Sequence, residues 1–147
     1  MKLLMIYCDR FAWKPAHKTL EDVPATDEPG ELHQVLVGLI QVEAEDMRDP
    51  AGVEKKLVKN LKWGARKNDS RTVLLHSFSH LSTSKADPAF TAELLERATR
   101  RLEVAGYRAD QTPFGYFLDL DLQAPGRSTA RIFVDISTGP AREGGED

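Results

Sequence analysis

Three runs of apolar residues in the first half of the chain have the character of buried β-strands. They are residues 2–7 (KLLMIY), 32–42 (LHQVLVGLIQV) and 71–75 (RTVLL). Near-continuous apolar runs of this length are typical of strands that are covered on both faces. The 9–30 segment between the first two runs contains Pro15, Pro24 and Pro29 among many charges. This composition predicts an irregular excursion, with at most a short edge strand near residues 16–20.

Two later segments have the periodicity of amphipathic helices. Each begins with Asp-Pro, at Asp49-Pro50 and at Asp87-Pro88, which places a capping residue before a proline at the first helical position. We predict that the first helix runs to about Arg66 and that the second ends at Gly106. Their apolar stripes have the spacing of one helix face: Val53, Leu57 and Leu61 in the first, and Phe90, Leu94, Ala98 and Leu102 in the second.

The last third of the chain alternates between apolar and polar residues, as half-buried strands do. Residues 114–122 (FGYFLDLDL) and 130–136 (ARIFVDI) predict two strands joined by a hairpin loop at 124–127, and residues 107–110 a short strand before them. The order of elements predicts an α/β (α+β) fold, with a mixed sheet and two main helices on one face. We expect one domain over residues 1–137 and a linker or disordered tail over 138–147.

Composition narrows the class of protein without naming a function. The 147 residues are 41% hydrophobic and 29% charged, with a formal net charge of −3, which is typical of one globular domain. No apolar run approaches the roughly 20 residues of a membrane helix, so no membrane partner is expected. Cys8 is the only cysteine. The simplest interpretation is a reducing compartment, the cytoplasm.

Candidate chemistry concentrates in residues 72–84 (TVLLHSFSHLSTS), where a buried strand opens into a polar loop before a helix. His80 could act there as a general base or a hydrogen-bond donor. His76 and His80 are four residues apart, but no Glu or Cys nearby completes a metal site, so none is expected. Asp119 and Asp121 are most simply the solvent face of their strand. The chain contains no G-x-S-x-G elbow and no phosphate-binding glycine motif.

Three short motifs carry a resemblance that spans nearly the whole chain. They are VLVGLIQVE (residues 35–43), FSHLS (residues 78–82) and TPFGYF (residues 112–117). In this order and at these spacings, they resemble the N-terminal editing domain of archaeal threonyl-tRNA synthetases, which is related in fold to the D-aminoacyl-tRNA deacylases. The resemblance implies a D-aminoacyl-tRNA deacylase-like fold and hydrolysis of serine that has been wrongly esterified to threonine tRNA.

The resemblance also implies a set of site residues and partners. The pocket would bind the 3′ end of threonine tRNA carrying serine, and the 2′-hydroxyl of the tRNA would help to activate water. No cofactor is implied. A homodimer and the rest of a threonyl-tRNA synthetase are the other expected partners. The residues expected to bind substrate are Val42, Ser79, His80, Pro113, Phe114, Gly115, Tyr116 and Phe117.

Two positions depart from the family pattern. Phe117-Leu118 stands where the family has Tyr-Lys, and Arg131 stands where it has Glu. A lysine and a carboxylate are therefore missing, so we assign the catalytic roles to His80 and Arg131 together with RNA and backbone groups. Two rival functions stay open: a D-aminoacyl-tRNA deacylase, which would differ in the chirality it accepts, and a non-catalytic module that binds a free amino acid.

Overall fold

The fold is built on one long strand that pairs with three others. The computed structural model describes residues 1–138, and the predicted tail lies outside these residues from 139 onward. Strand order is β4-β3-β2-β1-β5, with β6 also on β1; β2–β3 and β3–β4 are parallel and the other pairs antiparallel. The strands are β1 (Lys2–Lys18), β2 (Gly30–Gln41), β3 (Thr72–Ser77), β4 (Arg108–Gln111), β5 (Tyr116–Gln123) and β6 (Arg131–Asp135).

The length of β1 shows that the predicted irregular segment at residues 9–30 is wrong in its first part. β1 continues from the expected strand through Pro15 to Lys18, so residues 16–18 of the predicted separate edge strand are part of it and the irregular segment begins later. Pro15 is tolerated because the β1–β2 pairing has already ended at Trp13 and Gly30. Beyond that point β1 pairs only with β5, through a register shift between Pro15 and His17, so the missing amide hydrogen costs little.

The predicted hairpin between the last two strands is wrong. β5 pairs with Arg10–Lys18 of β1, and β6 pairs with Lys2–Ile6 of the same strand. The two strands thus follow one another along one edge of β1, and residues 124–130 connect them. β1 is long enough to hold both partners end to end, which no local pattern in residues 114–136 reveals.

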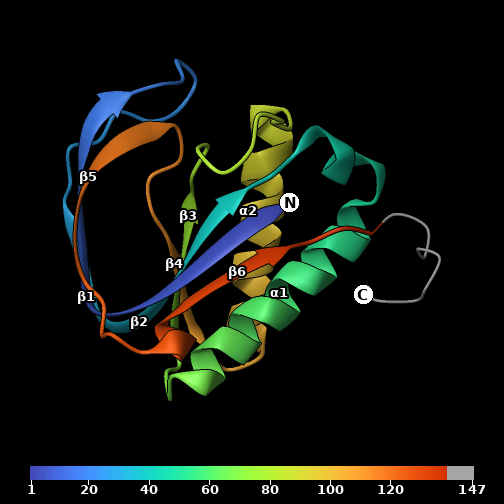
Figure 1. Cartoon of the computed structure of the whole chain (residues 1–147). Coiled ribbons are helices and arrows are strands. Elements are labelled where there is room, and N and C mark those ends of the chain that lie inside the picture. Colours follow the sequence, from blue (N-terminus) through green and yellow to red (C-terminus); the bar gives the residue numbers. More distant parts are fainter. Residues whose placement is uncertain (139–147) are drawn as a thin grey trace.

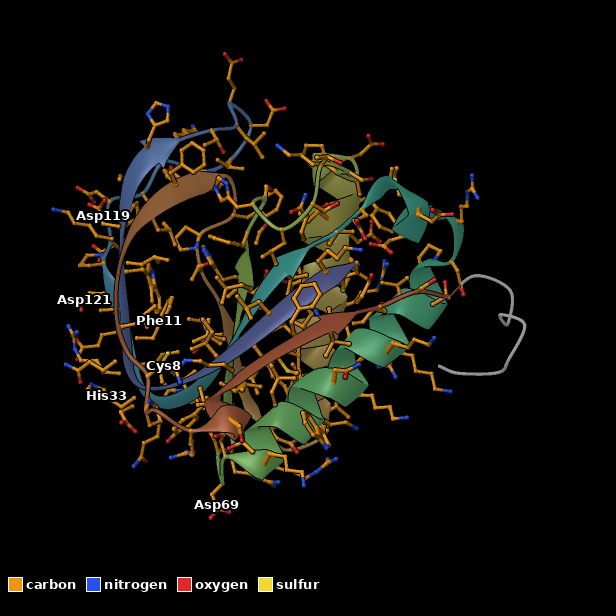
Figure 2. All side chains as sticks on the ribbon, viewed as in Figure 1. Cys8, Phe11, His33, Asp69, Asp119 and Asp121 are labelled. Atoms are coloured by element: carbon orange, nitrogen blue, oxygen red, sulfur yellow. The ribbon has the colours of Figure 1, made fainter. Side chains whose placement is uncertain are left out.

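β1 and β5 curve away from the two helices (Figure 1). The curvature accompanies a switch of side-chain parity: Cys8 and Phe11, which a regular strand would place on opposite faces, pack in the same core cluster. On the neighbouring strand, Gln34 has a φ of 49° at this level. Figure 2 shows Cys8 and Phe11 inside the curve and Asp119 and Asp121 outside it, and both aspartates are exposed, as predicted.

The helices agree with the sequence prediction. α1 (Pro50–Lys67) is capped by Asp49, whose side chain accepts a hydrogen bond from the Gly52 amide at 3.1 Å. α2 (Pro88–Val104) begins after Asp87, which occupies the N-cap position but makes no side-chain capping hydrogen bond, and it ends before Gly106, which has a φ of 92°. Both helices contribute to the larger core cluster, together with β1, β2 and β3. The 3₁₀ turns are η1 (Ala44–Arg48) and η2 (Ser128–Ala130). In the described part of the chain, neither helix has the length and hydropathy to cross a membrane.

Candidate functional site

A pocket of about 440 Å³ opens where β3 ends, between the loop that follows β3 and the segment that leads into β5. It is where the sequence placed the candidate chemistry. All eight residues expected to bind substrate line this pocket: Val42, Ser79, His80, Pro113, Phe114, Gly115, Tyr116 and Phe117. The structure therefore brings together residues of all three motifs, which are well separated in the sequence.

The loop after β3 is held by one buried side chain, that of Gln41 at the end of β2. The backbone N–H groups of Leu81 and Ser82 both donate to Gln41 Oε1 at 2.7 Å. Gln41 Nε2 in turn donates to the carbonyls of Ser82 at 2.7 Å and Ser84 at 2.9 Å. A loop with no regular structure is thereby held by four hydrogen bonds from a side chain that is 2% exposed.

A second anchor of the same loop is an ionic one. Ser82 Oγ donates to Glu43 Oε2 at 2.6 Å, and the N-terminal amine of Met1 lies 2.8 Å from Glu43 Oε1. Partial burial alone would raise the pKa of Glu43, but the hydrogen bonds from the amine and from Ser82 outweigh it and lower the pKa. Glu43 therefore stays ionised, and Ser82 is occupied as a donor rather than poised as a nucleophile.

Aromatic and imidazole rings form a row along one wall of the pocket. The His80 ring lies edge-on to Phe78 at a centroid distance of 4.9 Å and stacks near Phe117 at 6.1 Å. Phe117 also stacks near His17 of β1 at 6.3 Å. The row joins the β3 loop to β5 and β1. Phe117 is 53% exposed, so about half of its surface is open to a ligand group beside these two rings.

The segment before β5 needs its glycine. Gly115 has a φ of 84°, and a Cβ there would lie 2.9 Å from Val23. The Gly115 carbonyl accepts a hydrogen bond from the Thr19 amide at 2.7 Å. The Tyr116 hydroxyl donates to the Pro24 carbonyl at 2.7 Å, so it ties the 19–29 segment to the pocket and is not free to act on a substrate.

His76 and Thr112 form a buried pair at the back of the pocket. His76 Nδ1 lies 2.8 Å from Thr112 Oγ1, and the Thr112 amide donates to the Leu75 carbonyl at 3.1 Å. Burial, with a smaller contribution from the charge of His80, lowers the pKa of His76 to about 4. His76 is therefore neutral at pH 7. Among residues 1–138 no group of three or more metal-binding side chains occurs.

Arg131 is the one expected site residue that the structure does not bring to the pocket. It is exposed at the start of β6, opposite Ile6, and it does not line the cavity. Leu118 lies opposite Pro15 and does line it. Lys85 is the only Lys, Arg, Asp or Glu among the described residues that line the pocket. Sequence reasoning did not single out Gln41, Thr112 or Lys85. Gln41 and Thr112 act through hydrogen bonds to distant segments, and Lys85 is an exposed residue of the lining.

A mixed, curled sheet with two helices, and this pocket at the end of its parallel part, define a domain with a D-aminoacyl-tRNA deacylase-like fold, as expected. The solved structure of a protein titled c-Myc DNA Unwinding Element Binding Protein has a TM-score of 0.65 to this chain at 12% identity. It covers 94% of this chain, which covers 100% of that one, and the likeness shows the fold alone.

A family profile described as the archaea-specific editing domain of threonyl-tRNA synthetase matches residues 1–136. The chain therefore belongs to this family. Among its relatives are threonine–tRNA ligases of Thermococcus kodakarensis, 30% identical over 90% of this chain, and of Thermococcus sibiricus, 26% identical over 97%. The chain spans only 22–23% of the length of these two relatives.

Proposed function

We propose that this domain hydrolyses the ester bond of seryl-tRNA specific for threonine, and that it does so in the cytoplasm as part of a threonyl-tRNA synthetase. The observation that carries the proposal is the convergence of all eight expected substrate-binding residues on one cavity in a chain that belongs to an editing family. A synthetic site that accepts threonine cannot exclude serine by more than about 1–3 kcal/mol per missing methylene, so a second, hydrolytic site is needed.

Selection against threonine would arise from the lack of room for its methyl group. Val42 and Ala86, which are 4% and 9% exposed, give the pocket a closely packed apolar wall. Such a wall would have to move to accept an added methyl group, and overpacking of this kind typically costs about 1–3 kcal/mol. Correctly charged threonyl-tRNA would thus be spared.

The pocket favours a mechanism in which the RNA takes part. Ser82 is engaged with Glu43, and the residues that line the cavity include no Asp or Glu that could orient His80 as in a protein triad. In our proposal His80 positions the reacting water or the carbonyl group, and the tRNA 2′-hydroxyl supplies the activating group. Arg131 is exposed away from the lining, so it receives no contact with substrate in this mechanism.

The open side of the pocket suits the 3′ end of a tRNA. The exposed face of Phe117 can stack on the terminal adenine, and base–aromatic stacking contributes about 1–3 kcal/mol. Lys85, the charged residue of the lining, can meet a backbone phosphate. Pairing of two copies into a homodimer completes the proposal and is tested by the mass of the domain in solution.

The test is deacylation of seryl-tRNA and threonyl-tRNA, side by side, with the domain at catalytic amounts. We expect rapid loss of serine with threonine spared, a large loss of rate for His80→Ala and for tRNA with a 2′-deoxy terminus, and none for Arg131→Ala. Equal loss of both amino acids would refute methyl exclusion. Hydrolysis restricted to D-seryl-tRNA would indicate a D-aminoacyl-tRNA deacylase, and binding of free serine without hydrolysis would indicate a regulatory module.

A further inference from the structure

The buried part of the pocket lining contains one polar side-chain atom that has no hydrogen-bond partner among residues 1–138. Four of the lining residues are less than 10% exposed, and only His76 and Thr91 among them are polar; the other two are Val42 and Ala86. Thr91 Oγ1 donates to the Asp87 carbonyl of its own helix at 3.1 Å. His76 differs, because only one of its two ring nitrogens is engaged.

The free atom is His76 Nε2. The residue is 5% exposed and its Nδ1 is bonded to Thr112, while Nε2 has no partner among residues 1–138. In the same range, no fully buried side-chain nitrogen or oxygen lacks a hydrogen bond. Nε2 must therefore reach solvent, and the solvent that His76 borders is in the pocket. An almost completely buried imidazole thus presents one polar atom to a ligand.

The ring is held in one orientation. The hydroxyl of Thr112, the residue that directly follows β4, is hydrogen-bonded to His76 Nδ1. The centroid of the Phe78 ring lies 5.8 Å from that of the His76 ring. Because a hydroxyl can donate or accept, Thr112 accommodates either neutral tautomer, so Nε2 can serve as acceptor or donor. A neutral group with both capacities suits a ligand hydroxyl, and it offers no charge to attract an anion.

The position of Nε2 selects which part of the substrate it meets. The adenosine and its phosphate continue into the rest of the tRNA, so they must lie at the mouth, where His80, Lys85 and Phe117 are exposed. The aminoacyl group is the free, small end of the same molecule and is the part that can reach the floor. Serine has one further polar atom there, its side-chain hydroxyl.

We propose that His76 Nε2 forms the hydrogen bond that recognises the side-chain hydroxyl of the aminoacyl group. His76 is then a specificity-determining residue that selects serine over alanine, whereas the apolar wall acts against threonine. This inference rests on the proposed function of the pocket. A site that hydrogen-bonds a substrate hydroxyl disfavours an analogue without it, because the polar atom of the site is left without a partner.

Two substitutions of the same residue separate recognition from support of the fold. Asparagine places its amide near the position of Nδ1. His76→Asn can therefore keep the hydrogen bond to Thr112, but it has no polar atom at the position of Nε2 in the pocket. Glutamine reaches the position of Nε2, so His76→Gln can keep the group in the pocket. The measurement is kcat/KM for seryl-tRNA divided by kcat/KM for alanyl-tRNA, with the same threonine tRNA body.

We expect the serine-to-alanine ratio to fall roughly five- to tenfold in His76→Asn, the effect of one net hydrogen bond. We expect His76→Gln to restore most of it. A purely structural role would lower both rates together in both variants and leave the ratio unchanged, which would overturn the proposal. Thermal unfolding of each variant, followed by circular dichroism, shows whether the fold is intact.

Binding separates failure of this inference from failure of the proposed function. The probes are seryl- and alanyl-adenosine analogues in which N–H replaces the ester oxygen, so that no hydrolysis is needed. Tighter binding of the seryl analogue that is lost in His76→Asn would support hydroxyl recognition even if the domain hydrolysed nothing. Equal binding of both analogues by a domain that does hydrolyse seryl-tRNA would overturn the inference and leave the function standing.

Discussion

Gln41 should control the pocket although it is not among the residues that line it. We predict that Gln41→Met, which preserves volume and removes the amide, releases the loop that carries Ser79 and His80. Four hydrogen bonds are lost, each contributing about 1 kcal/mol net. Leu81, Ser82 and Ser84 are only half-buried, so water can hydrogen-bond their released backbone groups and offset part of the lost free energy. The expected loss is about 2–3 kcal/mol of unfolding free energy, and for a chain of this size a fall in Tm of roughly 4–12 °C.

The assay is urea unfolding followed by circular dichroism, in parallel with hydrolysis of seryl-tRNA. Gln123→Met is the matched control, because Gln123 is exposed on β5. We expect the control to unfold like the unmodified domain, and Gln41→Met to lose both stability and hydrolysis. If Gln41→Met unfolded at the same urea concentration as the control and kept full hydrolysis, the loop would be held by other contacts and the reasoning would be wrong.

Gln41→Glu is a sharper version of the same perturbation. The carboxylate keeps an acceptor for the two amides but places negative charge against the Ser82 and Ser84 carbonyls. Burial and these carbonyls raise the pKa of the introduced carboxyl group above its unfolded value of about 4.3. The variant should therefore be least impaired at acidic pH and lose stability as the pH rises through its folded pKa. A pH-independent difference from Gln41→Met would contradict this account.

Three further predictions concern single side chains. The pKa of His76 is lowered from 6.5 to about 4, so between these pH values the unfolded chain binds a proton that the native chain does not. The free energy of unfolding should therefore decrease by up to about 3 kcal/mol as the pH falls from 6.5 to 4. Urea titrations of His76→Gln should lose this dependence. Burial and, second, Asp9 raise the pKa of Cys8 to about 11, so iodoacetamide should label Cys8 only in denaturant; rapid labelling of the native domain would contradict its burial. Lys85→Gln should weaken binding of the tRNA 3′ end and reduce the slope of log affinity against log salt by about 0.7, the value for one single-strand phosphate contact. Lys59→Gln, on the exposed side of α1, should leave the slope unchanged, and equal slopes for both variants would rule out the contact.

Local sequence determined the elements whose signals lie within a few residues of one another. Both helices begin at their Asp-Pro pairs and turn the predicted stripes toward the core, because helix-start signals and periodicity act over one or two turns, although only Asp49 caps its helix with a side-chain hydrogen bond. The VLVGLIQVE, FSHLS and TPFGYF motifs pointed to all eight expected substrate-binding residues through family resemblance, although not through residue chemistry. The roles of those residues stay predictions until hydrolysis is measured.

Tertiary structure decided what depends on partners distant in the chain. β1 continues through Pro15 because β5 is the only described strand that pairs with it there, and β5 and β6 share an edge of β1 instead of forming a hairpin. In the sequence, Gln41 is a single polar residue in an apolar strand, and only the structure shows its four hydrogen bonds to the loop after β3. Arg131 stands where the family has Glu and was assigned a catalytic role, yet it pairs with Ile6 and does not line the cavity. Strand pairing and buried polar contacts join residues far apart in sequence, so no local sequence pattern predicts them or their contribution to stability.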